Sequence, residues 1–215
     1  FKSPYSLSKY VGEELCRLFT NLYGLETVSL RYFNVYGPRQ LLSGAYATVA
    51  GIFLKQMRSG QPLTIVGDGN IQRDFTHVSD VVKANILAAQ SKKVGKGEVV
   101  NIGTGKNYSI NEVAAMVLSL GNKPSRSFDS SKLRLGKPAI PQARLAMAGS
   151  AGSLQAGSGQ PQTILASAIK NNRATYIPAR PGETRKTLAN NSKARDLLGW
   201  KPTVALDKGL ENLLN

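Results

Sequence analysis

The sequence contains very little cysteine and histidine. Cys16 is the single cysteine, so no disulfide can form within the chain. Its apolar neighbours Leu15, Leu18 and Phe19 favour a buried, inert thiol over a nucleophile. One cysteine and one histidine, His77, cannot build a zinc site, and a Ser-His-Asp triad would depend on His77 alone. The shortage of cysteine favours a reducing, cytoplasmic setting. The shortage of both residue types argues against a metal site.

Long apolar runs are also missing. No stretch approaches the roughly 18 apolar residues that a membrane-spanning helix requires, so we expect no membrane partner. The first ten residues, FKSPYSLSKY, resemble neither a signal peptide nor a transit peptide. They lack an initiator Met and begin inside a motif, which leads us to expect a truncated reading frame.

Acidic residues are scarce, and the net charge is +15. Such a balance can indicate a nucleic-acid partner. Here, however, the basic residues are scattered, and the excess is local because residues 130–182 contain no Asp or Glu. An anionic small substrate explains the charge better, and we expect no nucleic-acid partner.

The order of predicted elements indicates an α/β protein with parallel strands. Ser3 and Pro4 form a good helix start, and Gly24 is a good helix end. Apolar periodicity and β-branched runs place the remaining elements. We predict strands at residues 27–36, 63–66 and 98–102, an extended segment at 72–78, and helices at 4–22, 47–58, 80–90 (with Ser79 as N-cap), 110–120, 192–198 and 206–214.

One stretch interrupts this alternation. Residues 130–163 are rich in Ala, Gly, Ser and Gln and contain no aromatic residue, so they bury too little surface to offset their ordering entropy. We expect a flexible insertion. The predicted organisation is therefore a core with interleaved substrate-binding segments (1–128), an insertion (129–174) and a C-terminal substrate-binding segment (175–215).

Tyr5 and Lys9 lie four residues apart, so they share one face of the first predicted helix. An ammonium close to a phenol favours the phenolate, which suits a general acid/base. Such a pair also arises by chance, and without further context two solvated residues on a helix surface are the better explanation.

The context comes from five motifs in fixed order. They are SPYSLSKYVGE, RYFNVYGPRQ, GDGNIQRDFTHVSDV, NIGTG and RPGE. This series resembles the extended short-chain dehydrogenase/reductase family, specifically its NAD-dependent nucleotide-sugar epimerases and dehydratases, over residues 3–128 and 175–213. The resemblance implies the C-terminal part of a doubly wound, Rossmann-like parallel sheet, joined to a small α/β substrate-binding domain. It also implies NAD as cofactor and a UDP-sugar, inverted at C4 by transient oxidation and re-reduction, as substrate.

The resemblance assigns roles around the cofactor. Tyr5 would exchange a proton with a sugar hydroxyl, and Lys9 would bind the nicotinamide ribose and acidify Tyr5. Tyr32 and Phe33 would pass the nicotinamide end of NAD. Asn34 would contact the sugar nucleotide, although a buried Asn in an apolar strand needs a partner in any case, and a backbone group would serve equally well.

It also assigns the substrate clamp. Arg73 and Arg180 would hold the diphosphate, and Glu183 would bind the nucleotide ribose. The strand from Leu63 to Val66 would line the nucleobase pocket. The alternatives are a surface pair between Arg73 and a nearby aspartate and, at residues 181–182, a plain turn. His77 and the turn at residues 103–105 are expected to be structural.

The departures from the family pattern leave alternatives open. The G-x-x-G-x-x-G turn that cradles the dinucleotide is absent, as is the Ser or Thr that precedes the catalytic Tyr. A 4,6-dehydratase of dTDP-glucose is the nearest rival activity. A non-catalytic fragment that keeps only nucleotide-sugar-binding residues is the alternative of another class. A homodimer through helix 4–22 and its neighbouring helix is the expected assembly.

Overall fold

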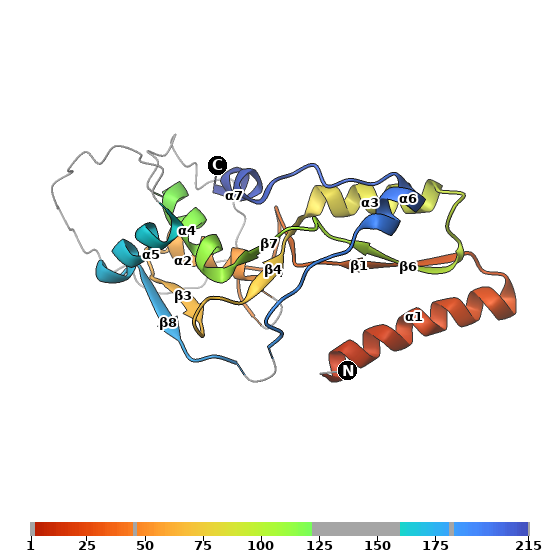
Figure 1. Ribbon diagram of the computed structural model, residues 1–215, viewed down its shortest axis with the longest axis horizontal. Helices are drawn as coiled ribbons and strands as arrows, with labels where there is room; N and C mark the ends of the chain where they lie inside the picture. The colour runs from red at the N-terminus through yellow and green to blue at the C-terminus, as the bar shows by residue number, and fades with distance from the viewer. Residues whose placement is uncertain (1–2, 45–46, 122–159, 181–182, 215) are drawn as a thin grey trace, which may run out of the picture.

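The computed structural model describes residues 3–44, 47–121, 160–180 and 183–214. Helices and strands alternate along most of the chain, as expected (Figure 1). The helices are α1 (Pro4–Tyr23), α2 (Val49–Arg58), α3 (Val78–Gln90), α4 (Ile110–Gly121), α5 (Pro161–Lys170), α6 (Ser192–Leu198) and α7 (Leu206–Leu214). The strands are β1 (Thr27–Tyr32), β2 (Val35–Tyr36), β3 (Leu63–Val66), β4 (Gln72–Asp74), β5 (Thr76–His77), β6 (Lys96–Ile102), β7 (Asn107–Ser109) and β8 (Ala174–Ile177).

Local signals set the ends of the first helix. The Ser3 side chain accepts a hydrogen bond from the Ser6 N–H, and Gly24 ends the helix with φ of 65°. Both ends therefore agree with the prediction, because capping depends on residues close in sequence. None of the helices in the described ranges is long and apolar enough to cross a membrane.

Two predicted details are wrong. The N-cap of α3 is His77, not Ser79, because the His77 ring accepts the N–H of Ser79. The predicted strand at 27–36 is two strands, β1 and β2, which pair with different partners. The break falls at Asn34, whose φ of 33° is outside the range of an extended strand.

One half of the molecule is built on the parallel pair of β1 and β6. Figure 1 shows α3 and α6 on one side of this pair and α1 on the other, the layering of a doubly wound sheet. The core between the pair and its upper helices consists of Val81, Ala84, Ala88, Val100, Ile102, Ala194, Leu198 and Trp200. This half corresponds to the expected Rossmann-like portion.

The other half surrounds the parallel pair of β3 and β8 and the antiparallel pair of β4 and β7. Helices α2, α4, α5 and α7 supply most of its core. Asp80, at the start of α3 in the β1/β6 half, accepts hydrogen bonds from Thr203 N (3.0 Å) and Val204 N (3.1 Å). These bonds attach the C-terminal segment that leads into α7 to the β1/β6 half, so the two halves are in contact.

The structure corrects the boundary of the expected insertion. The range 129–174 was expected to be flexible, but α5 lies inside it and packs Leu165 and Ala168 into the core beside α4. Ala174 begins β8 and is 3% exposed. The sequence of α5 has its apolar residues at helical spacing, a signal that the Ala-rich surroundings concealed. The rest of the insertion, residues 129–159, lies outside the described residues.

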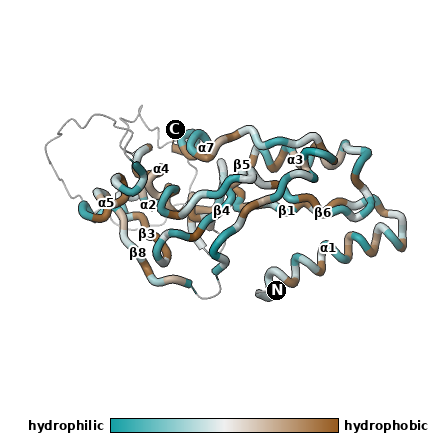
Figure 2. Tube along the Cα trace, viewed as in Figure 1, coloured by the Kyte–Doolittle hydropathy of each residue, from teal (hydrophilic) through white to brown (hydrophobic). Residues whose placement is uncertain are grey.

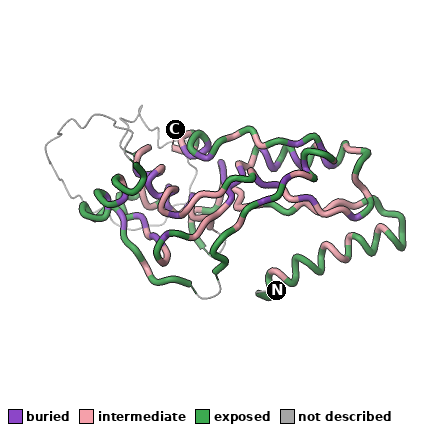
Figure 3. Tube along the Cα trace, viewed as in Figure 1, coloured by how far each residue is buried: buried purple, intermediate pink, exposed green. Residues whose placement is uncertain are grey.

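Helix α1 has apolar residues but no buried ones. Figure 2 shows apolar positions along its length, and Figure 3 shows the same helix exposed or half-buried throughout. Cys16 is half-buried, so the expectation of a buried thiol is only partly met. The reason is geometric: within the described residues α1 contacts β1 and β6 along one side and no other helix or strand closely.

Candidate functional site

Five of the six predicted substrate residues, all but Leu63, converge on one cavity of about 290 Å³. We call it the clamp cavity. It lies over one face of β3 and β8, between the start of α2 and β4. Its lining residues are Asn34, Ala47, Thr48, Val49, Ile52, Thr64, Val66, Ile71, Arg73, Phe75, Ile110, Ile177, Arg180 and Glu183. Asn34, Arg73, Arg180 and Glu183 are thus brought together from distant parts of the sequence.

Arg73 is oriented by three acceptors. Its Nη1 donates to the carbonyl oxygens of Gln72 (3.0 Å) and Thr184 (2.6 Å), and its Nη2 donates to Glu183 Oε1 (3.1 Å). The side chain is 13% exposed. The alternative, a surface pair with a nearby aspartate, is not found among the described residues. The ion pair with Glu183 holds the guanidinium at the cavity. The Glu183 carboxylate contacts Nη2, the same nitrogen that an anionic ligand would contact.

Asn34 finds its partner in the backbone. Its Nδ2 donates to the carbonyl oxygen of Asp74 (2.7 Å) and, more weakly, to Thr187 Oγ1 (3.4 Å). Of the two partners that the sequence left open, the structure shows the backbone group. The amide still lines the cavity, and its Oδ1 can accept a further hydrogen bond.

Asp74 is a central residue that the sequence did not single out. This fully buried carboxylate accepts hydrogen bonds from Thr104 N (2.9 Å), Gly105 N (2.9 Å) and Ala189 N (3.1 Å). Asp74 therefore joins its own strand, β4, to the turn at residues 103–105 and to the segment around Ala189, beneath the site. The turn at residues 103–105 is structural, as expected, because its N–H groups point to Asp74. Gly103 is required there because a Cβ would lie 2.3 Å from that of Ala189.

The strand β3 corrects one predicted site residue. Leu63 is 1% exposed and packs in the core, whereas Thr64 and Val66 line the cavity. Successive residues of a strand point to opposite faces, so Thr64 and Val66 share one face and Leu63 points to the other. The period-two pattern of the sequence LTIV would have identified Thr64, which was missed.

Tyr5 and Lys9 share one face of α1, as their spacing predicts. The Lys9 Nζ lies 5.4 Å from the centroid of the Tyr5 ring, and Tyr5 is 64% exposed. Neither residue lines the clamp cavity. In Figure 1 the N-terminal end of α1 is on the same side of the molecule as the segment that follows β8.

Tyr32 and Phe33 lie where β1 ends. The Tyr32 hydroxyl donates to Asn85 Oδ1 (2.9 Å), and the Phe33 N–H donates to the carbonyl oxygen of Ile102 (3.1 Å). His77 is occupied as the cap of α3 and packs edge-on against Tyr36, with ring centroids 5.3 Å apart. Burial lowers the pKa of His77, partly opposed by the negative charge of Asp80. His77 is thus placed in a structural role.

The clamp cavity places two guanidinium groups close to a carboxylate and an amide. The two guanidinium groups suit a diphosphate. A carboxylate suits paired hydroxyl groups, and the apolar wall of Val66 and Ile177 suits a flat ring. The combination describes a nucleotide diphosphate better than a free sugar or a free phosphate.

Comparison with known proteins gives a consistent result. Residues 2–103 match the family model described as the NAD dependent epimerase/dehydratase family. A putative UDP-glucose 4-epimerase of Methanocaldococcus jannaschii is 37% identical over 213 residues, which are 99% of this chain and 52% of that protein. The chain thus spans about half the length of the curated relatives that it matches.

Solved structures of UDP-sugar epimerases also match this chain. The UDP-glucose 4-epimerase of Thermotoga maritima, crystallised with UDP-glucose, is 32% identical with a TM-score of 0.70. It matches over 97% of this chain and 51% of its own. The UDP-glucuronic acid 4-epimerase of Bacillus cereus, in complex with UDP-glucuronic acid and NAD, is 31% identical with a TM-score of 0.68, over 97% of this chain and 50% of its own.

Proposed function

Because the chain belongs to the NAD-dependent epimerase/dehydratase family, we propose that this protein inverts C4 of a UDP-sugar by transient oxidation and re-reduction of that carbon. The observation that carries the proposal is the convergence of Asn34, Arg73, Arg180 and Glu183 on one cavity. Three relatives that align with almost the whole chain are UDP-sugar 4-epimerases by name.

In this proposal Arg73 and Arg180 hold the diphosphate, and Glu183 binds the ribose hydroxyls. The existing contact between Arg73 Nη2 and Glu183 Oε1 supports this division. An arriving phosphate would take the place of the carboxylate on Arg73, and Glu183 would then be free to accept from the ribose. Asn34 would meet the sugar nucleotide, and Val66 would contact the base.

Tyr5 and Lys9 fit the cofactor side. Both lie on one helix face, and the exposed Tyr5 ring and the nearby Lys9 ammonium leave their polar ends accessible to ligands. When bound, NAD would supply the hydride acceptor and donor for C4 of the sugar. Tyr5 would take the proton of the 4-hydroxyl and give it back, and Lys9 would bind the nicotinamide ribose and stabilise the phenolate. Tyr32 and Phe33 would flank the nicotinamide.

The test is binding and turnover of UDP-sugars. We expect UDP-glucose to bind the chain saturably and UDP to compete with it. We expect the proposed enzyme to interconvert C4 epimers of the sugar in the presence of NAD. Tyr5→Phe should abolish turnover while leaving UDP affinity unchanged, because the phenol acts on the sugar and not on the nucleotide. Absence of competitive UDP binding would contradict the proposed site.

We also propose a homodimer through α1 in a reducing, cytoplasmic setting. The exposed apolar residues of α1, among them Leu15 (48%), Leu18 (48%) and Leu22 (63%), support a covered face in the working protein. Analytical ultracentrifugation should show a dimer that Leu18→Glu disrupts. Lys208→Glu, on an exposed position of α7, is the matched control and should leave the dimer intact.

A further inference from the structure

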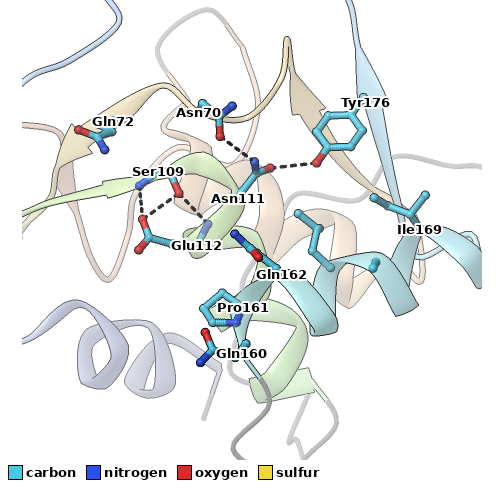
Figure 4. Close-up of a pocket in the computed structure, with 12 residues that line it drawn as sticks. Asn70, Gln72, Ser109, Asn111, Glu112, Gln160, Pro161, Gln162, Ile169 and Tyr176 are labelled. Carbon is cyan, nitrogen blue, oxygen red and sulfur yellow. Dashed lines mark hydrogen bonds between the residues drawn. The ribbon is translucent and has the colours of Figure 1, made fainter.

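A second cavity, of about 720 Å³, lies between α5 and the start of α4 (Figure 4). We call it the amide cavity, because side-chain amides dominate its polar lining. The lining residues are Asn70, Gln72, Ser109, Asn111, Glu112, Gln160, Pro161, Gln162, Leu165, Ala166, Ile169 and Tyr176. None of their side chains lines the clamp cavity.

The amide cavity is separate from the clamp cavity. Three pairs of chain neighbours divide between the two, one residue of each pair lining each cavity: Gln72–Arg73, Asn111–Ile110 and Tyr176–Ile177. Two of these pairs, Gln72–Arg73 and Tyr176–Ile177, lie on strands β4 and β8, where successive side chains point to opposite faces. The strands β4 and β8 therefore form a wall with one cavity on each side, and a ligand in one cavity would not overlap a ligand in the other.

The charge of the amide cavity is opposite to that of the clamp cavity. Glu112 is the single charged residue among its described lining residues, with no Lys or Arg, although the whole chain carries a net charge of +15. A phosphate or carboxylate ligand would meet a like charge there and no cation. The lining therefore favours a neutral ligand.

The polar groups of this wall are held in place by one another. The Asn111 Oδ1 accepts from the Tyr176 hydroxyl (3.2 Å), and the Asn111 Nδ2 donates to the carbonyl oxygen of Asp68 (3.0 Å). The Glu112 Oε2 accepts from Ser109 N (2.7 Å) and Oγ (2.8 Å). These contacts fix the side chains and leave acceptor capacity on the Tyr176 hydroxyl and on the second carboxylate oxygen of Glu112.

The opposite wall combines free amides with an apolar surface. Within the described residues, the side chains of Gln160 and Gln162 make no hydrogen bond to protein, and Figure 4 shows Gln162 directed toward Asn111. Beside them on α5, Ala166 and Ile169 are exposed apolar side chains. A suitable ligand therefore offers several hydroxyl or amide groups on one side and C–H groups on the other.

From this geometry we propose that the amide cavity binds a neutral saccharide unit, a hexose or an N-acetylated hexosamine, independently of the UDP-sugar in the clamp cavity. Its hydroxyl groups would bond to the amides, Tyr176 and Glu112, and its C–H face would rest on Ala166 and Ile169. The proposal does not depend on the proposed epimerase function, because it uses a different face of the strands.

The experiment is ligand-observed NMR and calorimetry on the full chain with glucose, N-acetylglucosamine and glucose 6-phosphate. We expect saturable binding of at least one neutral sugar, weaker binding of the phosphorylated one, and no competition from excess UDP. Ala166→Trp fills the cavity from an exposed position and should abolish sugar binding. Ser167→Trp, the next residue of α5 but not in the lining, is the matched control and should retain it.

Circular dichroism should confirm that both tryptophan variants keep the fold. If Ala166→Trp unfolds the chain, Gln162→Ala, which removes an amide without adding bulk, should weaken sugar binding instead. Three results would each overturn the proposal: no saturable binding of either neutral sugar, full competition by UDP, or unchanged sugar binding in the folded cavity variant. UDP binding in the same preparations reports on the clamp cavity separately.

Discussion

The guanidinium of Arg73 is held at the clamp cavity by two carbonyl oxygens and one carboxylate, and its side chain is mostly removed from water. Charged contacts to a ligand are stronger in such a place than on an open surface. We expect Arg73→Ala to weaken UDP binding by about 2–3 kcal/mol. Isothermal titration measures the loss, and Arg180→Ala should give a loss in the same direction.

The control for this prediction is Arg195→Ala on α6. Arg195 is exposed and lies outside the clamp cavity, so its removal subtracts the same charge from the chain and should change UDP affinity little. Equal effects of the two variants would mean that UDP responds only to overall charge. The clamp would then not exist as described.

His77 makes stability depend on pH in a defined direction. Its pKa is lowered from the ordinary 6.5, first by burial, so the folded chain binds this proton less readily than the unfolded chain. The contribution of His77 is complete above its unfolded pKa and is lost as pH falls toward the folded pKa. Protonation would also remove the ring acceptor for the Ser79 N–H.

His77→Asn tests this dependence. Asparagine is a good N-cap and does not titrate, so α3 should keep its start while the pH dependence becomes shallower. Urea unfolding between about pH 7.5 and about pH 5 would compare the two proteins. A wild-type chain that loses no more stability than the variant over this range would show that His77 titrates normally.

At the scale of elements, α5 is the segment whose role changed most between expectation and structure. Leu165 is 5% exposed and belongs to the core formed with α4, so its truncation should leave a cavity. We expect Leu165→Ala to lower the free energy of unfolding by about 2–5 kcal/mol. Chemical denaturation measures the change.

Ser167→Ala on the exposed side of the same helix is the matched control, since it tests helix propensity without touching the core. A small, equal effect of both substitutions would indicate that α5 is loosely attached. The flexible insertion expected from composition would then extend through residue 170 after all.

At the scale of the whole chain, a dinucleotide-binding motif is missing. The 215 residues contain no G-x-x-G-x-x-G turn, and backbone N–H groups at such a turn are what hold a dinucleotide pyrophosphate. We therefore expect the purified chain to bind NAD weakly or not at all, while still binding UDP. Calorimetry with both ligands on one preparation tests this, and a low-micromolar dissociation constant for NAD would contradict it.

This expectation is compatible with the proposed function. The chain spans about half the length of its curated relatives, and the clamp cavity lies wholly within the part that it shares with them. In the proposal this chain recognises the substrate and contacts the nicotinamide end of NAD, but it contains no turn for the pyrophosphate. UDP binding without NAD binding would show this difference directly.

Features that depend on neighbours along the chain could be predicted from the sequence. Helix α1 starts at Ser3 and ends at Gly24 as predicted, and β3 and α6 have the predicted bounds. Capping and periodicity act within one or two turns, so they can be recognised without the fold. The pairing of Tyr5 with Lys9 on one helix face is of the same kind.

Features that depend on the pairing of distant segments became visible only in the fold. Arg73 and Glu183 meet although 110 positions separate them, because β8 aligns beside β3 and Asp74 ties the following segment to the site. The same pairing places the Leu63 side chain in the core, and α5 packs its Leu165 and Ala168 side chains against that core. Such contacts depend on which strands lie side by side, and local composition and periodicity do not specify that arrangement.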